Sequence, residues 1–197
     1  NASTVGYKKS RAVFEDLLYQ NVNQPGGRSS QNSELPNGLM LGAGAKVVAT
    51  QKNFSQGNHI TTDNALDVTI QGAGFFEILM PDGTISYTRN GQLTTDSEGN
   101  LVTSGAGYQI QPTITVPPDA IEINISQDGE VSVKLQGQAD NAVLGQLTVT
   151  NFINPAGLEP IGQNLFKQTG ASGDPVQGVP GLEGLGYIVQ GALESSN

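Results

Sequence analysis

Few residues in this 197-residue chain offer the chemistry of an active site. Cysteine is absent, which excludes a disulfide framework, a thiolate nucleophile and a zinc–cysteine centre. His59 is the only histidine and lies among polar residues in the segment GNHITTD, which is typical of a surface turn. A pH switch or a metal ligand is the less favoured interpretation of His59, and a single histidine leaves little room for a Ser–His relay.

Three Gly-Ala-Gly triplets, at 42–44, 72–74 and 105–107, could in principle cradle a phosphate. A phosphate cradle needs such glycines directly before a helix, whereas the second and third triplets run into strand-like residues. We therefore interpret them as bulges or tight corners between strands. The acids lack the spacing of a calcium-binding loop, and any carboxylate pair suited to glycoside hydrolysis would be a coincidence. We predict no catalytic, cofactor-binding or metal-binding residues, and therefore no enzyme.

Composition favours a β-rich structural protein. Asn, Gln, Ser and Thr make up 62 of the residues, whereas charged residues make up 14%, below the usual value of about 25%. No apolar run is long enough to span a bilayer, and no basic segment followed by an apolar stretch marks a secretory signal. We expect an exported protein that does not insert into a membrane.

Charge is distributed unevenly along the chain. Residues 1–52 hold six basic and three acidic groups, and the remaining residues hold three basic and fifteen acidic groups, within a net charge of −9. An acidic body repels phosphates, so we predict no nucleic-acid partner. An ordinary acidic surface explains this pattern; the alternative is that the basic end of one copy contacts the acidic body of another.

The elements that position these residues fall into two parts. In SRAVFEDLLYQ, Val13 lies four residues before Leu17 and Phe14 four before Leu18, which predicts a short amphipathic helix over about residues 10–20. Residues 20–38 are then almost entirely Asn, Gln, Ser, Gly and Pro, a composition typical of an extended arm. So long a stretch is unusual inside a compact domain, which suggests that a neighbour orders it.

The rest of the chain has the pattern of antiparallel strands with one apolar and one hydroxyl-rich face. Residues 121–125 and 131–135 alternate apolar and polar residues on either side of Asp128-Gly129, which predicts a β-hairpin. The same design recurs around Asp82-Gly83 and, more weakly, over residues 93–104. Further strands are expected at 66–70, 147–150 and 187–189.

Four ordered motifs show a resemblance to the bacterial flagellar rod and hook proteins. NASTVGYKKSR at 1–11 is similar to the end of the family's N-terminal signature, and SQGNHITTDNALDVTIQGAGFF at 55–76 is similar to its strongest motif. YTRNGQLTTDSEGNLVTSGAGYQIQP at 87–112 and QGALESSN at 190–197 resemble two further motifs. Together these motifs cover essentially the whole chain, and their order and spacing make the resemblance specific.

The resemblance implies a mainly β, antiparallel domain of the flagellar hook/rod type, with one short N-terminal helix and an extended arm. The implied organisation is a connector over residues 1–45, the β domain over 46–189, and a segment over 190–197 that returns towards a C-terminal axial helix. Members of this family begin and end with axial helices. The sequence is therefore expected to be a fragment cut inside both of them.

The implied function is that of a structural subunit of the distal rod in the flagellar basal body. This rod is a helical polymer that spans the periplasm to the outer membrane and acts as a rigid drive shaft, transmitting torque to the hook. Subunits would leave the cell unfolded through the flagellar type III export apparatus. Implied partners are other copies of the chain, the proximal rod proteins, the hook protein and the surrounding ring proteins. The alternatives are another axial protein, from the hook or the proximal rod, and an exported β-rich protein that binds carbohydrate or acts on the cell wall.

Contacts between subunits are expected from basic and apolar side chains of the connector. The apolar stripe of the predicted helix would be buried against a neighbour, and the basic groups beside it would meet acidic groups of the neighbour's body. The candidate residues are Tyr7, Lys8, Lys9, Arg11, Phe14, Leu17, Leu18, Tyr19, Arg28, Leu35, Leu39 and Leu41.

Overall fold

The computed structural model describes residues 4–16, 20–21, 28–30, 33–34, 40–41 and 45–197. Regular structure in these residues is almost entirely antiparallel β-strand, which confirms the predicted fold class. Helix is limited among them to a single 3-10 turn, η1 at Pro155–Gly157, and no described helix could cross a membrane. The chain separates into two compact units, residues 10–52 and residues 1–9 with 53–197. We call the first unit the hairpin, after the pairing of its described strands, and the second the domain.

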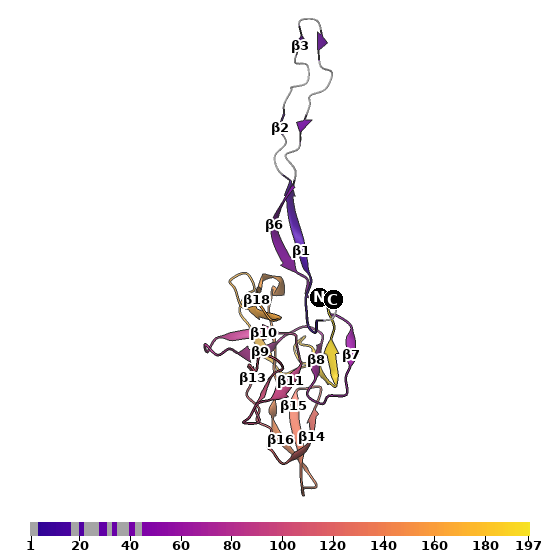
Figure 1. Ribbon diagram of the computed structural model, residues 1–197, viewed down its shortest axis with the longest axis vertical. Helices are drawn as coiled ribbons and strands as arrows, with labels where there is room; N and C mark the ends of the chain where they lie inside the picture. The colour runs from indigo at the N-terminus through magenta and orange to yellow at the C-terminus, as the bar shows by residue number, and fades with distance from the viewer. Residues whose placement is uncertain (1–3, 17–19, 22–27, 31–32, 35–39, 42–44) are drawn as a thin grey trace. The chain divides into compact units, whose positions relative to one another are not determined.

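The hairpin contains three nested antiparallel pairs of strands, which Figure 1 shows in indigo and violet. The pairs are β1 (Ser10–Asp16) with β6 (Ala45–Lys52), β2 (Gln20–Asn21) with β5 (Met40–Leu41), and β3 (Arg28–Ser30) with β4 (Ser33–Glu34). In the longest pair, Ser10 lies opposite Lys52 and Asp16 opposite Ala45, with a bulge between Val13 and Phe14.

The predicted helix over residues 10–20 is wrong where the structure describes it, because residues 10–16 form β1. A helix of about eleven residues is marginal in water by itself, whereas β6 (AKVVATQK) pairs with β1 along its length and includes three β-branched residues, which favour strands. Cross-strand pairing therefore satisfies the backbone that the helix would have satisfied internally. The hairpin extends to Lys52, past the expected end of the connector at residue 45.

The domain of residues 1–9 and 53–197 is built from one large sheet and several small ones. Its strands are β7 (His59–Thr61), β8 (Val68–Gln71), β9 (Phe76–Leu79), β10 (Ile85–Thr88), β11 (Leu93–Thr95), β12 (Leu101–Thr103), β13 (Gln109–Gln111), β14 (Ala120–Ile125), β15 (Glu130–Leu135), β16 (Asn141–Gln146), β17 (Val149–Asn151), β18 (Glu159–Gly162), β19 (Leu165–Lys167), β20 (Val176–Gly178), β21 (Tyr187–Gln190) and β22 (Ala192–Glu194). The large sheet has seven strands in the order β11-β12-β13-β9-β10-β19-β18. A three-stranded sheet, β14-β15-β16, and the pairs β17-β20, β21-β8 and β22-β7 complete the domain.

The three hairpins expected from the sequence are confirmed, since β14 pairs with β15, β9 with β10 and β11 with β12. Local turn chemistry explains why they were predictable. In the first, Gly129 has a φ of 87°, which only glycine adopts without strain, and the Asp128 carboxylate accepts a hydrogen bond from the Glu130 amide at 3.3 Å. Gly83 and Gly99 have similar φ values in the other two turns. The turn residues thus fix each register independently of the rest of the chain.

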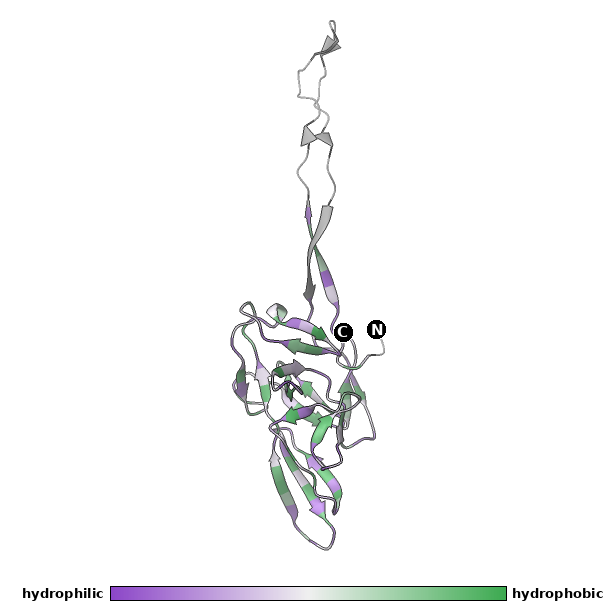
Figure 2. Cartoon of the chain, turned by 60° about the vertical axis from the view of Figure 1, so that its left-hand side comes forward, coloured by the Kyte–Doolittle hydropathy of each residue, from purple (hydrophilic) through white to green (hydrophobic). Residues whose placement is uncertain are grey.

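Two apolar clusters form the interior of this domain, and Figure 2 shows the apolar residues spread in green along its strands. The larger cluster is mainly aliphatic, whereas the smaller one gathers Phe75, Tyr87, Phe152, Leu158 and Phe166. Phe54 packs edge-on against the smaller cluster, with its ring centroid 5.4 Å from that of Phe75 and 5.0 Å from that of Phe166. It therefore fastens the segment that follows the hairpin to the core of the domain.

A hydroxyl in the core yields a prediction about stability. Thr69 on β8 is fully buried, and in the described part of the chain its Oγ1 is the buried side-chain polar atom that lacks a hydrogen-bond partner. Thr69→Val removes that hydroxyl, so we expect the free energy of unfolding to stay level or to rise by up to ~1 kcal/mol in urea denaturation.

The matched control is Thr88→Val on β10, which is equally buried. The Thr88 hydroxyl donates to the Asn164 carbonyl at 2.9 Å and accepts from the Asn90 amide at 3.0 Å. Its removal leaves both partners unsatisfied and is expected to cost about 1–3 kcal/mol. Equal losses in the two variants would contradict this assignment.

Candidate functional site at the junction of the two chain ends

The first and last described segments of the chain meet on one side of the domain. The Gly6 amide donates to the Glu194 carbonyl at 2.8 Å, and the Ser195 amide donates to the Asn58 carbonyl at 2.8 Å. β22 pairs with β7, so the final strands, yellow in Figure 1, lie beside β7 and β8. We call this region, made of residues 4–9, 53–58, 70–74, 89 and 192–197, the junction.

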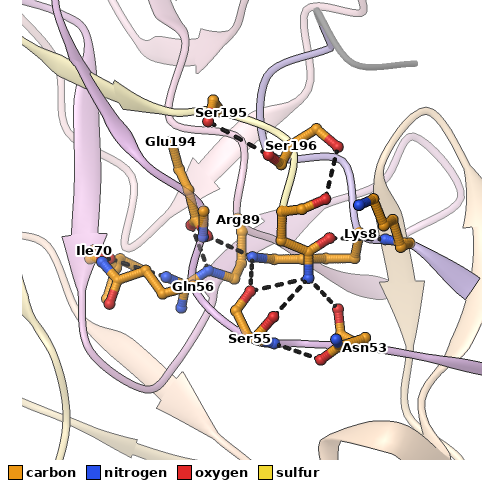
Figure 3. Close-up of polar contacts among 12 residues, drawn as sticks. Lys8, Asn53, Ser55, Gln56, Ile70, Arg89, Glu194, Ser195 and Ser196 are labelled. Atoms are coloured by element: carbon orange, nitrogen blue, oxygen red, sulfur yellow. Dashed lines mark hydrogen bonds and ion pairs between the residues drawn. The ribbon is translucent and has the colours of Figure 1, made fainter.

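At the centre of the junction a buried carboxylate contacts two buried cations. Lys8, Arg89 and Glu194 are 1%, 4% and 1% exposed, and Figure 3 shows their side chains directed towards one another. The Lys8 ammonium donates to Glu194 Oε1. Arg89 Nε donates to Glu194 Oε2 at 2.7 Å. Burial makes each of these charges costly alone, so the three are stable only together.

Backbone groups complete the coordination of all three charges. The Gly57 amide donates to Glu194 Oε1 at 2.8 Å, and the Lys8 ammonium also donates to the Ser55 carbonyl at 2.8 Å. The remaining Arg89 nitrogens donate to three carbonyls: Ile70 at 2.9 Å, Gly72 at 2.9 Å and Gly74 at 2.7 Å. A guanidinium with its donors arranged in a fork suits such a set of fixed acceptors.

Close packing explains the glycines of this region. A Cβ on Gly57 would lie 2.0 Å from the Ser195 carbonyl oxygen, and one on Gly74 would lie 2.1 Å from a methyl group of Val149. Gly72 and Gly74 also have φ values of 116° and 128°, which other residues rarely adopt. The second Gly-Ala-Gly triplet is thus a tight corner between β8 and β9 whose carbonyls bind Arg89.

Burial and the neighbouring charges shift the pKa values of Glu194 and Lys8. Burial opposes ionisation of Glu194, but the Arg89 guanidinium and hydrogen bonds from Lys8 and Gly57 outweigh it, so the pKa of Glu194 lies below its ordinary value. Burial lowers the pKa of Lys8, and its contacts with Glu194 offset this only in part. The two directions fit a site in which one carboxylate serves two cations.

Chemically, this arrangement binds segments together rather than reacting with a substrate. Each of its charged groups is buried and already holds partners within the chain. Among the described residues, no cluster of three or more His, Asp or Glu side chains could hold a metal ion. Asp96 and Glu98 border a hollow on the β11–β12 turn, but both accept hydrogen bonds from the Asn100 amide group and belong to one turn. They do not face each other across a groove, as a glycosidase pair would.

The structure places the predicted contact residues in different settings. Lys8 is buried in the junction, Tyr7 is half-buried, and Lys9, Arg11 and Phe14 are exposed. Arg28 and Leu41 lie in β3 and β5, where only the backbone is described. Leu17, Leu18, Tyr19, Leu35 and Leu39 lie outside the described residues.

Sequence reasoning did not single out Arg89, Glu194 or Asn197, although each lies in one of the four motifs quoted above. The signal was present, because Lys8, Ser55–Gly57, Arg89 and Glu194 come from the four different motifs and meet here. Each motif thus contributes one part of the site, although no motif by itself shows that these parts lie close together.

Because one carboxylate pairs with two cations, we expect loss of the carboxylate to destabilise the fold more than loss of one cation. Glu194→Gln leaves two buried cations without a carboxylate between them, and we expect a loss of about 3–5 kcal/mol in the free energy of unfolding. Lys8→Met retains the Arg89–Glu194 pair, so a smaller loss, about 1–3 kcal/mol, is expected from urea denaturation. A loss in Lys8→Met as large as that in Glu194→Gln would refute this account.

Acid should remove the contribution of Glu194. Because its folded-state pKa lies below the ordinary value of 4.5, its stabilising effect is complete above that pH and disappears as the pH falls through the folded-state pKa. Urea unfolding of the wild type and of Glu194→Gln should differ by a constant amount from pH 6 to 8 and converge in stronger acid. The difference isolates Glu194 from the other carboxylates, and a gap that persists unchanged at pH 2 would contradict the assignment.

Comparison with known proteins identifies the family. The model of the flagellar hook protein FlgE/F/G D1 domain matches residues 69–133. Flagellar basal-body rod protein FlgG of Buchnera aphidicola subsp. Schizaphis graminum is 51% identical over 197 residues, covering all of this chain and 75% of that protein. The FlgG protein of Borreliella burgdorferi is 48% identical over 199 residues, with the same two shares.

A hook protein gives a shorter match. Flagellar hook protein FlgE of Helicobacter mustelae is 42% identical over 118 residues, covering 56% of this chain and 24% of that protein. The full-length matches to rod proteins confirm the prediction of a structural subunit of the flagellar basal-body distal rod, and favour it over the hook alternative. The chain belongs to the family of the flagellar basal-body rod protein FlgG.

Proposed function

We propose that this chain works by packing against copies of itself in a helical shaft, and that its hairpin supplies part of the contact between copies. Contacts that join different surfaces of identical subunits do not close on themselves and so generate a helical polymer. The observation that carries the proposal is the exposure of large apolar side chains on β1, described next.

Phe14 is 65% exposed and Val13 is 39% exposed, and they are neighbours at the bulge of β1. Exposed aromatic side chains beside arginine are characteristic of protein interfaces, where burial in a complementary surface provides most of the binding energy. Arg11 is exposed on the same strand. A neighbouring subunit would bury Phe14 and pair with Arg11.

Charge supports a contact between the hairpin of one copy and the domain of another. The hairpin holds four basic and three acidic residues, whereas the domain of residues 1–9 and 53–197 holds five basic and fifteen acidic residues. Opposite potentials steer association and disfavour contacts between two acidic domains. Lys9, which belongs to the domain and directly precedes the hairpin, is also exposed.

The junction gives this subunit the resistance to load that a shaft requires. Both end segments are held by buried charges rather than by exposed ion pairs, which contribute little. We further propose that the proximal rod proteins, the hook protein and the surrounding ring proteins contact the assembled shaft, and that the chain has a mechanical rather than a catalytic role.

Replacing the exposed aromatic residue tests this proposal. Phe14→Ala should leave the fold of the chain unchanged, because the side chain is mostly exposed, but truncating an aromatic anchor costs an interface about 2 kcal/mol or more. In cells that carry the variant in place of the wild type, we expect electron microscopy of purified basal bodies to show fewer complete rods with hooks.

Val143→Ala on β16 is the matched control, since Val143 is an apolar residue of the domain with 62% exposure. This variant should assemble as the wild type does. Normal numbers of complete rods in Phe14→Ala cells would argue against the hairpin as a contact surface.

A further inference from the structure

The residues that flank the hairpin lie next to each other in the domain. The chain enters the hairpin after Lys9 and leaves it before Asn53, and the Asn53 amide donates to the Lys9 carbonyl at 2.8 Å. This hydrogen bond continues the antiparallel register of β1 and β6, whose first pair is Ser10 with Lys52. We call the Lys9–Asn53 pair the base of the hairpin.

The side chain of Asn197 contacts both halves of this base. Its Oδ1 accepts from the Lys9 amide at 3.0 Å, and its Nδ2 donates to the Asn53 carbonyl at 2.8 Å. Nδ2 also lies within hydrogen-bond distance of the Ser55 carbonyl, at 3.1 Å, and of the Ser55 hydroxyl, at 3.0 Å. One amide of the C-terminal segment therefore bridges the two residues that flank the hairpin.

The Ser55 carbonyl connects this amide to the buried charges. It accepts from the Lys8 ammonium at 2.8 Å as well as from Asn197, and Lys8 in turn pairs with Glu194. Glu194 and Asn197 lie in the same segment, three residues apart. Asn197 is half-buried at the edge of the network, where an amide can exchange its partners for water at little cost. We therefore infer that Asn197 keeps its position because Glu194 anchors the segment that carries it.

We propose that docking of the C-terminal segment, residues 192–197, sets the base of the hairpin. Glu194 anchors the segment, and Asn197 is the positioning residue that holds Lys9 and Asn53 in register. When the segment undocks, the Asn197 amide no longer bonds to Lys9 and Asn53. Lys8, next to Lys9, loses its ion pair with Glu194 at the same time. The C-terminal segment and the base of the hairpin are therefore expected to open together, as one cooperative local unfolding unit.

This coupling is a property of the single chain and stands apart from assembly. Its consequence for assembly rests on the proposed function: a subunit would present a hairpin with an ordered base only when its C-terminal segment is docked. Hydrogen exchange of the single chain therefore tests the coupling, whereas electron microscopy of basal bodies tests the contacts of the hairpin. Either proposal can fail without the other.

Amide hydrogen exchange of the 197-residue chain, followed by NMR, tests the coupling. The reporter is the Asn53 amide, which donates to Lys9 and not to Asn197. We expect Glu194→Gln and Asn197→Ala each to accelerate exchange at Asn53 by about tenfold or more, together with exchange at Ser195. The effect of Glu194→Gln is the more telling, because Glu194 contacts neither Lys9 nor Asn53 through its carboxylate.

Two control variants change side-chain hydrogen bonds elsewhere in the domain. Asn154→Ala removes a side-chain bond to the Ala171 carbonyl of 2.9 Å, and Glu77→Gln alters a carboxylate that accepts from the Thr150 hydroxyl at 3.0 Å. Both should leave exchange at Asn53 unchanged. Acceleration in the controls as large as in the junction variants would show a global effect and overturn the proposal.

The proposal also fails if exchange at Asn53 is unchanged in Asn197→Ala, whatever happens at Ser195, since the segment would then loosen without affecting the base. Should Glu194→Gln unfold the whole domain, Asn197→Ala decides alone, because its side chain lies at the edge of the network and not among the buried charges. Counts of assembled rods do not enter this test.

Discussion

The domain's two ends depend on one buried carboxylate held between two cations. Glu194, Lys8 and Arg89 each lose hydration on burial and regain partners only from one another and from nearby backbone groups. The segments that carry these three residues, far apart in the sequence, must therefore pack together for any of the charges to be satisfied. Close packing around the site also accounts for its glycines, because a Cβ would meet the Ser195 carbonyl oxygen at Gly57 and a methyl group of Val149 at Gly74.

Much of the fold followed from local chemistry in the sequence, but the site did not. Turns such as Asp128-Gly129 specify their hairpins through φ and a side-chain hydrogen bond, both encoded within a few residues. Residues 10–16 were mispredicted because their partner, β6, lies about thirty residues away, and a helical spacing of apolar residues can also be accommodated by a strand. Glu194 was hidden for the same reason: its importance depends on Lys8 and Arg89, whose proximity no local pattern encodes.

Membership of the rod family relates the polar composition and the buried charges of this chain to the demands on a rod subunit. A shaft subunit needs surfaces that bind copies of itself and an interior that does not yield between them. Uncharged polar side chains dominate the composition, and many of them, such as Asn197 and Gln56, bond to backbone groups between segments. Hydrogen bonds of this kind join segments without the cost of burying further charge. Among the described residues, three of the four buried charged side chains, Lys8, Arg89 and Glu194, lie together in the junction, where each has several partners.

The adjacency of Lys9 and Asn53 makes the hairpin a modular insertion. Because the chain leaves and re-enters the domain at two hydrogen-bonded residues, the length of what lies between them is not set by the domain's own packing. Loop-closure entropy grows only slowly with length, so an insertion at such a point can lengthen or shorten at little thermodynamic cost. The stretch between Lys9 and Asn53 can therefore change in length while the β domain, with its charged junction, keeps its own packing.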